Sequence, residues 1–327
     1  MNNVKLQSMA FLLSALLATP ILAADESTSA QSATKEATKA ATMAASKAAP
    51  KLAGVPELLA QPEPPADQRY FYGEDEFQFA DLRVPPGDGP FPVVVLVHGG
   101  CWLAQYGIGH IGAMAQALTD AGVATWALEF RRIGNEGGAW PGTFLDVANG
   151  TDFLRQIAPA HNLDLNRVVL VGHSAGGHLV LWLAARHKLS VASELYSENP
   201  LPVAGVVALA PAADLELTYR NQTCGDAAQK LVGGTAEEYP QRFIDGSASA
   251  MLPLGVPQVI VNGDHDEGWL TVSRAYQKKA ANAGEAVEII IPPDAGHFEL
   301  VMPGNPAFDL VRETILTMLP PATSNVN

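Results

Sequence analysis

Runs of β-branched and other apolar residues recur along the chain from residue 77 onwards, and several of them end in glycine. Most of these runs lack alternation of apolar and polar positions, which is typical of strands buried on both faces of a sheet. The segment 77–85 does alternate and predicts an antiparallel strand or hairpin at the edge of the sheet. The predicted buried strands cover residues 93–100, 123–130, 168–174, 204–211, 257–264 and 286–292.

Helix-length segments with apolar and polar residues lie between these runs. Strand and helix in alternation predict an α/β fold, with a mostly parallel central sheet and helices on both faces. One domain over residues 67–320 accounts for the whole pattern, and a polar, flexible tail is expected at 321–327. The clearest helical segments cover residues 111–122, 146–158, 176–188 and 270–284.

The first 66 residues have a different composition. Residues 1–24 combine Lys5, an apolar run and a small-residue exit, which predicts a signal peptide and hence an exported protein, periplasmic or secreted. The apolar run is shorter than the roughly 20 residues of a membrane-spanning helix, so we expect no stable membrane insertion. Residues 25–66 are rich in Ala, Thr, Ser and Pro and predict a disordered linker.

Charge and cysteine content narrow the classes of function. The formal net charge is -14, and such a field repels the phosphates of nucleic acid, which we do not expect as a partner. Export would permit a disulfide between Cys101 and Cys224, but Cys101 falls in a loop with a predicted chemical role, which favours two unpaired thiols. Histidine spacing does not suggest zinc, and we expect no metal and no cofactor. The pattern does not distinguish a monomer from an oligomer.

The stretch VGHSAGGH, residues 171–178, joins a predicted strand to a predicted helix. In such sheets, ligands bind beyond the carboxyl ends of the strands. A turn this sharp requires small residues two positions before and after its centre, and Gly172 and Gly176 flank Ser174 at those positions. A turn that merely reverses the chain would explain the glycines alone. We interpret Ser174 as a nucleophile.

A serine nucleophile needs a histidine that accepts its proton and a carboxylate that orients the histidine. In this class of sheet the three follow in the order serine, acid, histidine. His297 comes directly after the last predicted strand and is the candidate base, because His178 and His187 lie on or just past the helix that follows the serine. Asp266, three residues after a strand-ending glycine, is the candidate acid.

Two alternatives to Asp266 lie in the same loop. Asp264 is the first, which we interpret as a turn-forming or helix-capping residue, and Glu267 is the second. The oxyanion formed during acyl transfer also needs two N–H donors. We predict that Ala175, directly after the serine, supplies one and that Gly100 or Cys101, in the glycine loop after an earlier strand, supplies the other.

These motifs together resemble those of the α/β-hydrolases, and among them the hormone-sensitive-lipase-like and kynurenine-formamidase-like esterases. The resemblance covers residues 70–320 and rests on VHGGCW, FRRIG followed by WPGTFLDV, GHSAGGH, NGDHDEGW and AGHFEL. It implies the α/β-hydrolase fold, the triad Ser174, Asp266 and His297, and the oxyanion donors Gly100, Cys101 and Ala175.

Other positions have expected roles. Lipase-like relatives have a third glycine where this chain has Cys101 and Trp102, so we expect Trp102 to wall the acyl pocket. Trp140, in a glycine-rich loop, is a second candidate for substrate contact. The resemblance implies a structural pair between Arg131 and Asp146. The segment 213–240 is longer than a simple crossover and could form a small cap.

The combined prediction is an exported carboxylesterase that acts on small-molecule esters of short chain length through an acyl-enzyme. The formamidase-like loop leaves an arylformamidase-like amidase open. From another class, an inactive hydrolase fold could serve as a binding protein.

Overall fold

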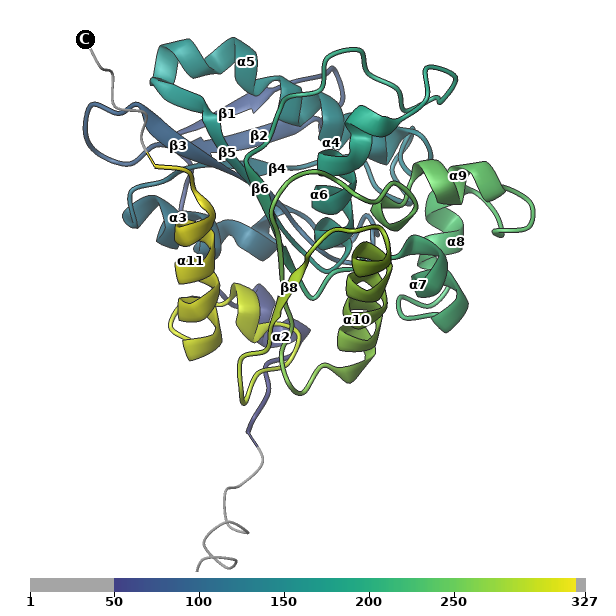
Figure 1. Ribbon diagram of the computed structural model, residues 1–327. Helices are drawn as coiled ribbons and strands as arrows, with labels where there is room; N and C mark the ends of the chain where they lie inside the picture. The colour runs from purple at the N-terminus through teal and green to yellow at the C-terminus, as the bar shows by residue number, and fades with distance from the viewer. Residues whose placement is uncertain (1–49, 322–327) are drawn as a thin grey trace, which may run out of the picture. The chain divides into compact units, whose positions relative to one another are not determined.

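A computed structural model describes residues 50–321 of the chain. Its core is an 8-stranded sheet in the order β1-β2-β4-β3-β5-β6-β7-β8 (Figure 1). Strand β2 is antiparallel to both of its neighbours, and all other pairs are parallel. The strands are β1 Gln68–Phe71, β2 Phe79–Arg83, β3 Phe91–Val97, β4 Ala124–Leu128, β5 Leu163–His173, β6 Gly205–Leu209, β7 Gln258–Val261 and β8 Glu288–Ile290.

The central strands are buried on both faces, as their unbroken apolar runs predict. Val95 of β3, for example, pairs with Trp126 on one side and Leu170 on the other, and all three side chains are fully buried. Every predicted strand is confirmed. The separate edge strand β1 was not delimited by the sequence, and it moves β2 one position in from the edge.

Helices cover both faces of the sheet, with α3 and α11 on one face and α4, α6 and α10 on the other (Figure 1). Helix α6 is buried along its whole length, which explains its almost uninterrupted apolar sequence. The helix predicted at 146–158 is two helices, and α11 was not predicted. The α-helices are α2 Val55–Leu59, α3 Gly112–Asp120, α4 Gly142–Asp152, α5 Leu154–Ile157, α6 Ala175–Ala185, α7 Leu215–Asn221, α8 Ala227–Val232, α9 Pro240–Asp245, α10 Glu267–Asn282 and α11 Pro306–Met318.

Residues 50–66 differ from the sequence expectation of a disordered linker. They form one compact unit with the domain and include α2, whose Leu58 is buried in the hydrophobic core. Arg83 of β2 donates a hydrogen bond to the carbonyl of Pro64 at 2.6 Å. A few apolar side chains suffice to dock this segment, although its overall composition is typical of a linker. The predicted signal peptide, linker residues 25–49 and tail residues 322–327 lie outside the described residues.

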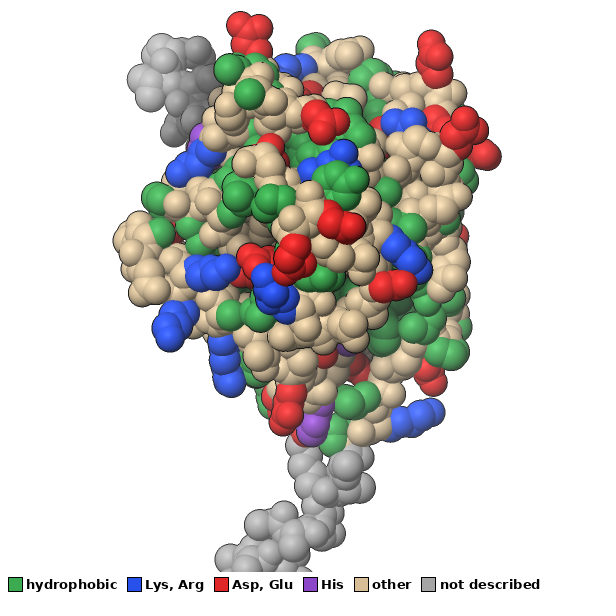
Figure 2. All heavy atoms as spheres, turned by 90° about the vertical axis from the view of Figure 1, so that its right-hand side faces the viewer, with side chains coloured by type: hydrophobic (Ala, Val, Ile, Leu, Met, Phe, Trp, Pro, Cys, Tyr) green, Lys and Arg blue, Asp and Glu red, His purple; other side chains and the backbone are tan. Residues whose placement is uncertain are grey.

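Figure 2 shows the face that carries α7 to α10, where Lys and Arg side chains lie among Asp and Glu side chains. Exposed ion pairs form within these helices, such as Arg220 with Glu216 at 2.7 Å and Lys230 with Asp226 at 2.9 Å. Such pairs add little to stability.

Over residues 50–321, no helix combines the length and the apolar character needed to cross a membrane.

Candidate active site

Ser174 occupies a strained turn between β5 and α6. Its backbone has φ 57° and ψ -116°, a combination that residues other than glycine rarely adopt. A Cβ atom on Gly172 would lie 2.3 Å from the carbonyl oxygen of Gly176, and one on Gly176 would lie 2.1 Å from the carbonyl oxygen of Val97. The turn therefore requires glycine at both positions, as the sequence predicts. The amide of Ser174 donates a hydrogen bond to the Leu209 carbonyl at 2.8 Å.

The structure brings Asp266 and His297 together at the same end of the sheet. His297 Nδ1 lies 2.6 Å from Asp266 Oδ2. Asp266 occupies the N-cap position of α10, and His297 follows β8. An ionised carboxylate can only accept a hydrogen bond, so His297 donates from Nδ1 in this contact, and Nε2 of the neutral ring keeps its lone pair. Trp269, in the first turn of α10, stacks on the imidazole at 5.0 Å between ring centroids.

Asp264 has a different contact from Asp266. Its Oδ1 accepts a hydrogen bond from the amide of Ala295 at 3.0 Å, and the amide of His265 donates to the Ala295 carbonyl at 2.9 Å. A Cβ atom on Gly263 would lie 2.3 Å from that same carbonyl oxygen. Asp264 thus shapes the loop that holds His297, and Asp266 contacts the imidazole itself.

The loop after β3 contains three successive residues with positive φ: 105° at Gly100, 50° at Cys101 and 59° at Trp102. A Cβ atom on Gly100 would lie 2.4 Å from the side chain of Tyr106, so the first position requires glycine. The amide of Leu103 donates to the Gly100 carbonyl at 2.9 Å and closes the turn. Of the other predicted oxyanion donors, Cys101 follows in this loop, and Ala175 is the first residue of α6.

Ser174 and His297 line one cavity of about 280 Å³ together with Gly100 and Cys101. The rest of its lining is mostly apolar and aromatic. His173, Trp269 and Phe298 belong to motifs recognised in the sequence, and Thr223 and Cys224 belong to the segment 213–240 expected to form a cap. The other lining residues had no signal in the sequence. The additional lining residues are Val55, Leu58, Leu103, Tyr106, His110, His173, Thr223, Cys224, Trp269 and Phe298.

Trp102 and Trp140, expected to contact substrate, are not among the described residues that line this cavity. Trp102 is 1% exposed and packs edge-on against His178, at 5.4 Å between ring centroids. Trp140 donates to Glu194 Oε1 at 3.2 Å and packs against Phe144. The expectation that both contact substrate in this cavity is therefore not supported, because Trp102 packs into the protein interior and Trp140 packs against Phe144 and bonds Glu194.

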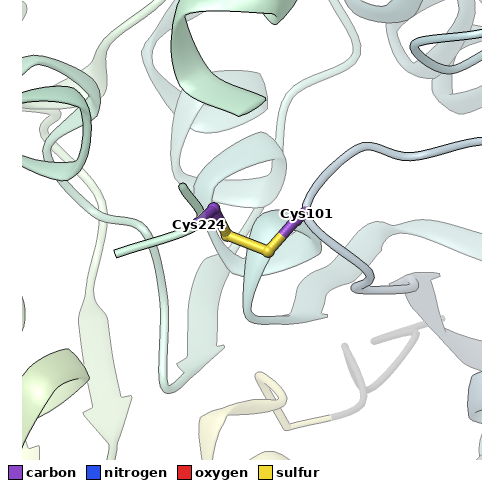
Figure 3. The surroundings of a disulfide bond; sticks show 2 residues. All are labelled: Cys101 and Cys224. Carbon is purple, nitrogen blue, oxygen red and sulfur yellow. A yellow bond between two sulfur atoms is a disulfide. The ribbon is translucent and has the colours of Figure 1, made fainter. Parts of the chain in front are cut away.

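Cys101 and Cys224 form a disulfide bond (Figure 3), so the expectation of two unpaired thiols is wrong. That expectation treated a chemical role for Cys101 as incompatible with a bond. The predicted role uses the backbone amide, however, which leaves the side chain free to be bonded. Cys224 lies in the turn between α7 and α8, and with Thr223 it brings the segment 213–240 to the cavity.

Two buried histidines, His110 and His173, form a hydrogen-bonded chain that ends on the backbone of His297. His173 Nε2 lies 2.9 Å from the His297 carbonyl oxygen, and His173 Nδ1 lies 2.8 Å from His110 Nε2. Because a carbonyl only accepts, His173 donates from Nε2 and accepts from His110. Burial, with the neighbouring histidines, lowers the pKa of His110 to about 3 and holds that of His173 well below its usual value. Both rings are therefore neutral at physiological pH.

Two buried carboxylates brace the neighbouring loops. Asp146 binds Arg131 through both side-chain oxygens, at 2.8 Å each, which confirms the predicted pair. Glu129 contacts His98 and Arg132 at 3.0 Å each. Burial works to raise the pKa of Glu129, but the contact with His98, the charge of Arg132 and the hydrogen bond from the Phe130 amide outweigh it, and the pKa lies below its ordinary value. Within the described part of the chain, acidic, histidine and cysteine side chains form no cluster suited to a metal ion.

Comparison with known proteins connects this geometry to esterases. Esterase LipC of Mycobacterium tuberculosis is 25% identical over 244 residues, which make up 72% of this chain and 60% of LipC. The probable isoprenylcysteine alpha-carbonyl methylesterase ICMEL2 of Arabidopsis thaliana is 36% identical over 110 residues, 33% of this chain and 25% of the plant protein. The chain thus spans less than two thirds of the length of either relative.

The solved structure of esterase B from Lactobacillus rhamnosis with a tributyrin phosphonate superposes with a TM-score of 0.67. The match covers 90% of this chain and 96% of that chain at 21% identity. This likeness and the sheet order establish the α/β-hydrolase fold. The BD-FAE family profile matches residues 80–274, more than half of the chain, from β2 through the first half of α10. The chain belongs to the BD-FAE family.

Proposed function

We propose that the protein is a serine carboxylesterase that cleaves small esters of short-chain acids. The observation that carries this proposal is the contact of Asp266 with His297, in a cavity that His297 shares with the strained serine turn. The esterase names of its relatives support the same reaction class. The phosphonate in the esterase B structure derives from tributyrin, a short-chain ester, in agreement with the proposed substrate size.

The proposed reaction begins with attack of Ser174 Oγ on the ester carbonyl carbon, while His297 Nε2 accepts the hydroxyl proton. The oxyanion is stabilised by the amides of Ala175 and of Gly100 or Cys101. Collapse of this intermediate breaks the bond to the alcohol, which takes the proton from His297 and leaves the acyl group on Ser174. A water molecule, deprotonated by His297, then attacks the acyl-enzyme and restores the free serine. Asp266 orients the imidazole and stabilises its protonated form throughout.

The cavity favours uncharged and compact substrates. The described residues that line it include no Lys, Arg, Asp or Glu, so a charged acyl group would lose its hydration without gaining an ionic partner. Its volume of about 280 Å³ lies at the small end of ligand-binding pockets. Both features agree with neutral esters of short chain length.

The proposal includes export. The disulfide between Cys101 and Cys224 supports it, since such bonds persist in oxidising compartments and are rare in the cytosol. Detection of the oxidised protein in a periplasmic or culture fraction tests this part of the proposal, and its retention in the cytosol with reduced thiols would contradict it.

The test of the reaction compares kcat/KM for p-nitrophenyl butyrate and for N-formylkynurenine, in the wild type and in Ser174→Ala. We expect hydrolysis of the ester and a loss of at least 10³-fold in the variant, because triad members act as a unit. Labelling by a fluorophosphonate should also disappear in Ser174→Ala. Preference for the formamide would instead establish the amidase, and an unreactive wild type would favour the binding protein.

A further inference from the structure

The segment that precedes the matched family region forms part of the candidate active site. Val55 and Leu58 of α2 line the cavity that contains Ser174 and His297. Both lie well before residue 80, where the family match begins, and within the range whose composition suggests a linker. A wall of the cavity thus comes from outside the residues that carry the family motifs.

A single buried carboxylate connects this segment to the loop of His297. Glu299 is 3% exposed, and its Oε1 accepts a hydrogen bond from the amide of Ala53. Its Oε2 accepts from the amide of Gly296 at 2.9 Å. Since Gly296 directly precedes His297, the segment before α2 and the candidate base share one anchor. A buried carboxylate with two amide donors holds both strongly.

Helix α2 presents one face to the cavity and the other to solvent. The neighbouring leucines mark the two faces, because Leu58 is 3% exposed and Leu59 is 55% exposed. The start of the short helix is held locally, as the Glu57 side chain accepts from the Gly54 amide at 3.0 Å and Leu58 donates to the Gly54 carbonyl at 3.1 Å. The direction of Leu58 is therefore set by both the helix and the anchor.

We propose that Leu58 is a specificity-determining residue that limits the length of the substrate chain accepted beside Ser174. This inference rests on the proposed esterase function. In an apolar pocket, one methylene group of the substrate changes kcat/KM by roughly 10-fold or more, because it either fills space or collides with the wall. Replacing leucine by alanine removes three carbon atoms from this wall, enough space for additional methylene groups.

The experiment compares kcat/KM for p-nitrophenyl acetate, butyrate, hexanoate and octanoate in the full-length protein. In Leu58→Ala we expect the ratio of octanoate to acetate to rise by about tenfold. In Leu58→Phe, whose larger side chain projects further into the cavity, the same ratio should fall. Leu59→Ala changes a leucine of the same helix on the solvent side and should leave the ratio at its wild-type value.

Opposite shifts in the enlarging and filling variants cannot result from partial unfolding, which lowers all four rates by the same factor. Equal ratios in the wild type, Leu58→Ala and Leu58→Phe would overturn the proposal, as would an equal shift in Leu59→Ala. Failure of the esterase proposal itself has a different signature, because the wild type would then hydrolyse none of the esters or Ser174→Ala would retain the activity.

Discussion

Two aspartates that are two positions apart in the sequence make different contacts in the structure. Asp266 lies against the imidazole of His297, whereas Asp264 binds the amide of Ala295 in the loop that carries it. A role in orienting the base depends on the charge of the carboxylate. A role in holding a backbone amide requires only an oxygen atom that accepts a hydrogen bond.

Amide substitutions separate these two roles. In Asp266→Asn, the side chain can donate to His297 Nδ1 and favour the wrong tautomer, so we expect kcat to fall by roughly 10³ to 10⁴. In Asp264→Asn, an amide oxygen remains to accept from Ala295, and kcat should stay within about threefold of the wild type. Both values come from steady-state hydrolysis of p-nitrophenyl butyrate. A larger loss in Asp264→Asn than in Asp266→Asn would reverse the assignment.

The disulfide links two segments that are otherwise far apart in the chain. Cys101 lies in the loop after β3, next to Gly100, and Cys224 lies 123 residues later, in the turn between α7 and α8. Both line the cavity. The bond therefore restrains the unfolded chain and also fixes a wall of the candidate site to the loop with three positive φ angles.

Reduction of this bond should lower both stability and turnover. Loss of a native disulfide costs about 2–5 kcal/mol, which corresponds to a decrease in Tm of roughly 4–9 °C for a chain of this size. We expect dithiothreitol to lower Tm by that amount and, at 25 °C, to reduce kcat more than it raises KM. The control is Cys224→Ala, which cannot form the bond and should not respond to dithiothreitol. An unchanged Tm of the reduced wild type would contradict the prediction.

Features of the whole molecule that depend on local pattern were predictable. The unbroken apolar runs indicated the buried strands, and the two glycines around Ser174 indicated the sharp turn, because steric limits act between near neighbours. The pairing of Cys101 with Cys224 and the burial of Leu58 depend on contacts between distant segments. Trp102 illustrates the same limit, since its position in the loop was predictable but its packing against His178 was not.

The interior also contains neutral histidines that should make global stability depend on pH. His178 of α6 is fully buried, donates to the Gly246 carbonyl at 2.7 Å, and packs edge-on against Trp102 and Phe144. Burial lowers its pKa from 6.5 to about 4, although the hydrogen bond to Gly246 and the charge of Asp214 partly oppose this. Between about pH 4 and pH 6.5, His178 is therefore neutral in the folded protein and protonated in the unfolded chain.

The free energy of unfolding should therefore decrease as the pH falls from 6.5 towards 4. In that range the unfolded state binds more protons than the folded state, so acidification favours unfolding, and His178 alone accounts for on the order of 3 kcal/mol. Urea unfolding at pH 7, 6, 5 and 4.5 measures this slope.

His178→Gln retains a donor for the Gly246 carbonyl and cannot titrate, so its slope should be shallower than that of the wild type. His187→Gln, at an exposed position just after α6, serves as the matched control and should keep the wild-type slope. Equal slopes in the wild type and His178→Gln would show that the buried imidazole is not the group that titrates.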